Sequence, residues 1–105
     1  MKIVNRGYII VKAKQPFVNW ANQQEEEFVM TSNTEPNVYL IEEDFFEIEP
    51  VIKQYFKKIF ANELLAISED ESIYPDFKLE VFKEWFSYEL GSTVFDTQKE
   101  QLQGE

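Results

Sequence analysis

Two segments of this chain are apolar on both faces of an extended strand, and they limit the folds open to it. Residues 6–13 and 37–41 are rich in β-branched and aromatic side chains, which favour strands. Apolar side chains occupy both the odd and the even positions of each segment. A strand of this kind lies in a sheet covered on both sides, or its second face meets another subunit. The sequence therefore predicts a sheet with two faces that need cover.

Three further segments have the apolar spacing of helices. Residues 16–23 carry one apolar stripe after a Pro that suits a first helical position. Residues 49–64 show near-perfect 3.6-residue periodicity and are the strongest helix prediction. Residues 77–88 carry an unusually aromatic stripe, with Asp76 as a candidate cap and Gly91 as the residue that breaks the pattern.

The order of these elements predicts the fold class. Short strands are expected at residues 28–31 and 92–96, so two helices follow one another between strands, which is typical of an α+β protein. We expect a small, largely antiparallel sheet of three or four strands, with two longer helices packed on one face and one short helix. The short helix, residues 16–23, is expected to cover part of the second face, and a homodimer would cover the rest. Residues 1–96 are predicted to form one domain, and residues 97–105 a polar, disordered tail.

Acidic side chains dominate the charge of the chain. Twenty Asp and Glu residues against ten Lys and Arg residues give a formal charge of −10. A nucleic-acid partner is not expected, because binding phosphates requires clustered cations. Residues 1–14 carry four cations and no acid, whereas residues 15–52 carry nine acids and no cation. Either the first strand is neutralised by acidic neighbours, or the acids form a face for a basic partner.

The composition also excludes several classes of chemistry. The 105 residues include no Cys and no His, so disulfides, thiolate or His-activated nucleophiles and the usual zinc sites are excluded. Only three Gly residues occur, too few and too scattered for a phosphate-binding loop. The apolar run Tyr8–Val11 is too short for a signal-peptide core or a membrane span, which favours a cytoplasmic protein without a membrane partner. The patterns single out no catalytic residue and no cofactor.

Two acidic clusters are the candidates for cation binding. Glu42–Asp44 follows a predicted strand, and Asp70–Asp76 lies in an acidic loop. A hard divalent cation would bind there only if several oxygen ligands converged, and the spacing of a calcium-binding loop is absent. The simpler interpretation is that these acids favour helix N-termini and keep the protein in solution.

The aromatic residues are numerous for a chain of this size, and a small fold need not bury every ring. The chain holds ten Phe, five Tyr and two Trp residues, and an aromatic stripe at helical spacing is typical of a core. A surplus left on the surface would mark a contact site. An exposed patch containing Trp20, Tyr39 or Trp85 is the candidate interaction surface.

Short motifs resemble those of a group of small bacterial proteins of unknown function. The motifs are Lys14–Phe17, Val38–Ile41, Phe82–Phe86 and Ser92–Asp96. They are spread over nearly the whole chain. The resemblance implies a bacterial origin and does not imply an activity.

These observations favour a non-enzymatic, acidic domain that binds an unidentified protein or a second copy of itself. One alternative is a small carboxylate-based enzyme or ligand-binding protein, with or without a divalent cation. The other is an acidic mimic of nucleic-acid charge, which would need acids spaced regularly over one continuous face.

Overall fold

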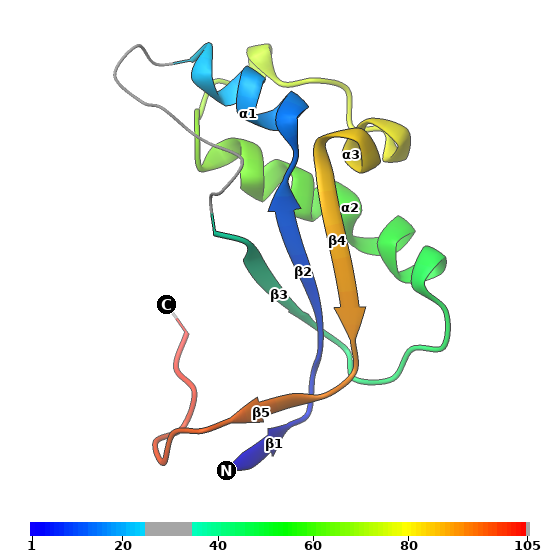
Figure 1. Ribbon diagram of the computed structural model, residues 1–105, viewed down its shortest axis with the longest axis vertical. Coiled ribbons are helices and arrows are strands. Elements are labelled where there is room, and N and C mark those ends of the chain that lie inside the picture. Colours follow the sequence, from blue (N-terminus) through cyan, green and yellow to red (C-terminus); the bar gives the residue numbers. More distant parts are fainter. Residues whose placement is uncertain (25–34, 105) are drawn as a thin grey trace.

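Antiparallel pairing around one central strand organises the protein. The structure, a computed structural model, describes residues 1–24 and 35–104, and its strands and α-helices are labelled in Figure 1. In chain order they are β1 (Lys2–Val4), β2 (Gly7–Ala13), α1 (Gln15–Asn22), β3 (Asn37–Ile41), α2 (Ile48–Leu65), the 3₁₀ turn η1 (Glu71–Ile73), α3 (Leu79–Trp85), β4 (Phe86–Gly91) and β5 (Val94–Asp96).

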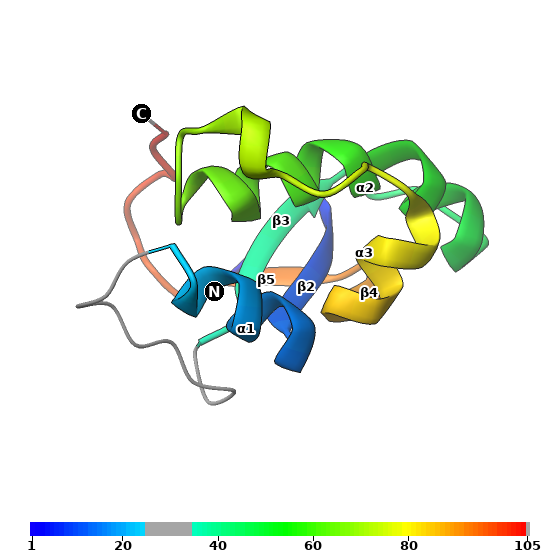
Figure 2. The same ribbon diagram turned by 90° about the horizontal axis from the view of Figure 1, so that it is seen from above.

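The larger sheet has the strand order β3-β2-β4, with both neighbours antiparallel to β2. Helix α2 lies on one side of these strands (Figure 2). Helices α1 and α3 lie at the end of the sheet where β2 ends and β4 begins (Figure 1). The predicted α+β class, with small antiparallel sheets and helices, is confirmed.

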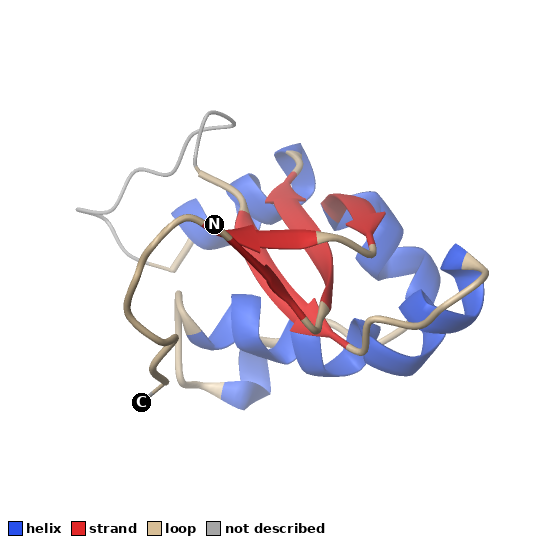
Figure 3. Ribbon diagram, turned by 90° about the horizontal axis from the view of Figure 1, so that it is seen from below, coloured by secondary structure: helices blue, strands red, loops and turns tan. Residues whose placement is uncertain are grey.

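Strands β1 and β5 form a separate two-stranded ribbon that crosses the end of the larger sheet (Figure 3). Val4 pairs with Val94, and Tyr8 pairs with Gly91. Three residues therefore separate these pairs on one strand and two on the other, which is the arrangement of a β-bulge. An extra residue of this kind bends a strand, in line with the change in direction between the sheet and the ribbon. The strand predicted at residues 92–96 thus forms, but it joins the ribbon instead of the main sheet.

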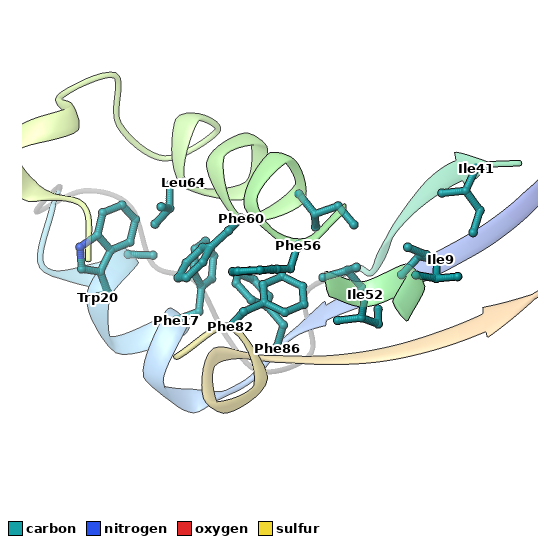
Figure 4. Close-up of a cluster of buried hydrophobic side chains, with 14 residues drawn as sticks. Ile9, Phe17, Trp20, Ile41, Ile52, Phe56, Phe60, Leu64, Phe82 and Phe86 are labelled. Carbon is teal, nitrogen blue, oxygen red and sulfur yellow. The ribbon is translucent and has the colours of Figure 1, made fainter. Parts of the chain in front are cut away.

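The core lies between α2, the covered face of the sheet and the two shorter helices. Phe60, Phe82 and Phe86 are fully buried, and their rings contact one another with centroids 5.2–5.8 Å apart (Figure 4). Burial of each large apolar side chain contributes roughly 1.5–3 kcal/mol. The aromatic stripe of α2 and α3 therefore belongs to the core, as the spacing indicated.

The third helix is shorter than the sequence pattern predicted. A helix was expected over residues 77–88, but α3 ends at Trp85 and the chain continues directly as β4. From Phe86 onward, inward and outward positions alternate, and β4 pairs with six residues of β2. Aromatic residues at 82, 85, 86 and 88 fit either period, and the backbone hydrogen bonds offered by β2 favour the strand.

The second face of the sheet is not covered by α1, contrary to the prediction. The buried residues Phe17, Trp20 and Ala21 of α1 join the same core as Ile9 and Val11 of β2. The other side of the sheet remains accessible in the described part of the chain, and we call it the open face. It is formed by Tyr8, Ile10 and Lys12 of β2, Val38 and Leu40 of β3, and Ser87 and Glu89 of β4.

Two sequence predictions concern segments at the margins of this fold. The strand predicted at residues 28–31 lies outside the described residues. Residues 97–104 contain neither helix nor strand, and Lys2 Nζ donates to the carbonyl oxygens of Lys99 and Glu100 at 3.2 and 3.3 Å. None of the helices in the described ranges combines the length and the apolarity needed to cross a membrane.

Two glycines at the end of the sheet differ in how a methyl group would fit. A Cβ on Gly7 would lie 2.8 Å from the Glu42 carbonyl oxygen and 3.0 Å from that of Gly91, whereas a Cβ on Gly91 would meet the ring end of Tyr8.

We expect Gly7→Ala to lower the free energy of unfolding by about 1–3 kcal/mol, because the backbone around the new methyl group must move. Gly91→Ala should cost less, since the half-exposed Tyr8 ring can rotate. Urea unfolding checks the order, and an equal or larger cost for Gly91→Ala would contradict it.

Candidate interaction surface

The open face owes its character to the two-residue period of β2. Ile9 and Val11 point into the core and are fully buried, so Tyr8 and Ile10 point to the other side. Tyr8 is paired with Leu40, and Ile10 with Val38, which brings four apolar side chains together on adjacent strands. Val38 is 59% exposed and Leu40 is 50% exposed. This contiguous apolar surface arises because β2 is apolar on both faces, whereas the described residues cover only one of them.

Beside these side chains lies a shallow hollow of about 530 Å³ that carries one charge of each sign. It is lined by Ile10, Lys12, Pro36, Ser87, Tyr88 and Glu89. Lys12 and Glu89 lie on adjacent strands, two residues apart in the register. Within residues 1–24 and 35–104 one ion pair is found, between Lys83 and Glu49 at 2.9 Å. Lys12 and Glu89 therefore do not form an ion pair in this part of the chain. The open face is therefore electrically balanced, although the protein carries a charge of −10.

The aromatic residues proposed from sequence for a contact surface pack inward. Trp20 is 9% exposed, and its indole N–H donates to the Ile73 carbonyl oxygen at 3.2 Å. Trp85 is half-buried, with its ring centroid 6.0 Å from that of Trp20 and 5.7 Å from that of Phe60. Tyr39 is half-buried and faces α2. These three side chains support the fold, and the exposed apolar surface is built from other residues.

Tyr39 belongs to a buried polar network that ties β3 to α2. The Glu63 carboxylate is 8% exposed and accepts hydrogen bonds from the Tyr39 hydroxyl at 2.5 Å and the Asn37 amide at 2.7 Å. The Tyr39 hydroxyl in turn accepts from the Asn62 amide at 3.0 Å. Burial and the hydrogen bond to Glu63 raise the pKa of Tyr39 well above its usual range. These hydrogen bonds join side chains of β3 to side chains of α2, so the network holds the edge strand β3 in place.

Sequence reasoning missed Glu63, although a signal for it exists. It lies four residues after Ile59 and three after Phe60, on the apolar stripe of the helix. An acid at such a position is buried when the helix packs, and burial of a charge requires hydrogen-bond donors nearby. A lone acid within an apolar stripe is therefore a marker for a buried network.

In the first acidic cluster, Glu42–Asp44, one carboxylate contacts a helix and the other two are exposed to solvent. The Tyr55 hydroxyl of α2 donates to the Glu42 carboxylate, which lowers the pKa of Glu42 and raises that of Tyr55. Glu43 and Asp44 are exposed. The contact fixes the loop after β3 against α2.

The second acidic cluster contains a turn cap. Asp70 accepts hydrogen bonds from the Ser72 amide at 3.0 Å and the Ser72 hydroxyl at 2.6 Å, and these bonds lower its pKa. Asp76, at the other end of this loop, is exposed. Within residues 1–24 and 35–104, no group of three or more acidic side chains is placed to hold a metal ion.

The network around Glu63 leads to a prediction for Tyr39→Phe. The variant removes one of the two donors to a buried carboxylate, so the free energy of unfolding should fall by about 1–3 kcal/mol. Tyr8→Phe is the matched control, because the Tyr8 hydroxyl lies on the open face and should change stability by less than about 0.5 kcal/mol. Urea unfolding of both variants measures the difference. Equal effects of the two substitutions would contradict the role of the network.

The raised pKa of Tyr39 predicts a loss of stability in alkali. In the unfolded chain Tyr39 ionises near pH 10, whereas in the fold it keeps its proton to a higher pH. Its contribution is therefore complete below about pH 10 and is lost as the pH rises toward the folded pKa. We expect the free energy of unfolding to fall more steeply above about pH 10 in the parent protein than in Tyr39→Phe. Parallel curves from denaturant titrations at each pH would count against it.

Comparison of the chain with protein-family models, with curated proteins and with solved structures found no match. The resemblance to a group of small bacterial proteins therefore stays a prediction, and the functional argument rests on the geometry of this chain.

Proposed function

We propose that this chain is a non-enzymatic domain that self-associates through the open face. The observation that carries the proposal is the contiguous apolar surface of Tyr8, Ile10, Val38 and Leu40, on a sheet that residues 1–24 and 35–104 cover only on its other side. Exposed apolar surface of this kind favours contact with another surface, because contact removes it from water. A sheet face that meets a second copy also satisfies the pattern of strands apolar on both sides.

Charge favours a second copy as the occupant of this face. Two copies that each carry −10 repel one another wherever their acids face each other. The open face contains one acid, Glu89, and one cation, Lys12, so two such faces carry no net charge against each other. A basic partner would instead be drawn to the acidic remainder of the surface. The balanced, apolar face is thus suited to an equally acidic partner, and a second copy is such a partner.

The two alternatives rest on composition more than on geometry. A carboxylate-based enzyme would use an acid with a shifted pKa in a pocket, whereas the buried acid Glu63 is engaged by Asn37 and Tyr39. A mimic of nucleic-acid charge would use acids on one regular face, whereas Glu42 and Asp70 take part in loop and turn contacts. Neither alternative accounts for the exposed apolar side chains of the open face.

Substitution of one leucine on the open face tests the proposal. We expect the parent protein to form dimers in light scattering after size exclusion, and Leu40→Glu to be monomeric because it places a charge in the apolar contact. Leu65→Glu is the matched control, since Leu65 is 54% exposed at the end of α2, away from the open face. It should dimerise like the parent. A parent protein that stays monomeric at high concentration, or equal effects of both variants, would overturn the proposal.

A further inference from the structure

We infer that two copies pack their open faces about a two-fold axis, with Lys12 of each copy paired with Glu89 of the other. This inference rests on the proposed self-association and specifies its geometry. The two charges lie on adjacent strands, in the pairs Ile10↔Glu89 and Lys12↔Ser87, and both line the hollow beside the apolar side chains.

Two-fold symmetry makes this pair of charges self-complementary. In an isologous contact, if the first residue of one copy meets the second residue of the other copy, the second residue of the first copy also meets the first residue of the other. An axis that exchanges the Lys12 and Glu89 positions therefore places an ammonium opposite a carboxylate twice. Both side chains are exposed and are available for such a contact.

When the apolar side chains of two copies come into contact, Lys12 and Glu89 are stable in the contact only if each is paired with an opposite charge. Closing the open face takes Lys12 and Glu89 out of water, and a charge left unpaired in a closed contact is costly. In the separate protein an exposed pair would contribute little, so its absence there is expected. The pairing fixes the register of the two sheets, whereas the apolar side chains supply most of the attraction.

Charge reversal distinguishes contacts between copies from contacts within one copy. Lys12→Glu leaves two acids at the hollow, and Glu89→Lys leaves two cations. Each variant alone should show a dissociation constant raised by about tenfold or more, because like charges then face each other across the contact. An equimolar mixture of the two should form a heterodimer, since every charge again meets its opposite. Both variants remain strongly acidic overall, so general attraction does not explain association of the mixture.

Sedimentation velocity of the parent, of each variant and of the mixture measures these constants. Lys57→Glu and Glu80→Lys are control reversals at exposed positions outside the open face, and they should leave dimerisation unchanged. Circular dichroism and urea unfolding check that each variant is folded. Association of the mixture, with the single variants monomeric, supports the pairing.

Two other outcomes overturn the inference in distinguishable ways. If the mixture stays monomeric while the parent dimerises and Leu40→Glu does not, the pairing of Lys12 with Glu89 is wrong and self-association through the open face stands. If the parent itself is monomeric, the proposed function fails and the inference fails with it.

Discussion

The structure depends on the pairing of β2 with strands on both of its sides. This pairing places Ile9 and Val11 over the core and joins β3 to β4, which come from distant parts of the chain. The C-terminal end of β2 positions α1 and α3. Ala13 lies just before α1, and it pairs with Phe86, which directly follows α3. Both shorter helices are thus fixed at one end of the sheet.

Polar contacts complete the attachment of β3, which pairs with β2 alone in the described part of the chain. Glu63 binds Tyr39 and Asn37 of this strand, and Tyr55 binds Glu42 just beyond it. Helix α2 therefore holds β3 through two hydrogen-bonded contacts as well as through apolar packing. A buried carboxylate is costly unless donors meet it, so the network also favours one position of the strand against the helix.

Cover of the sheet on one side, as far as the structure describes the chain, is the basis of the proposed function. The helices take their apolar residues to one core, and this leaves Ile10, Val38 and Leu40 on the other side. Most acidic side chains lie elsewhere, and the open face is balanced by Lys12 and Glu89. We propose that these two features together direct self-association to a single face. The geometry thus points to a use for strands that carry apolar residues on both sides.

The sequence by itself determined the α+β class, the central strand and the long helix, because these depend on local periodicity and strand propensity. It also excluded Cys- and His-dependent chemistry. Only the tertiary structure decided where α3 ends, since Phe86 and Tyr88 fit a helix or a strand until β2 supplies hydrogen bonds. It likewise placed Trp20 in the core, packed Trp85 against that core and gave Glu63 its donors. Such outcomes depend on contacts between residues far apart in the chain, which no local pattern contains.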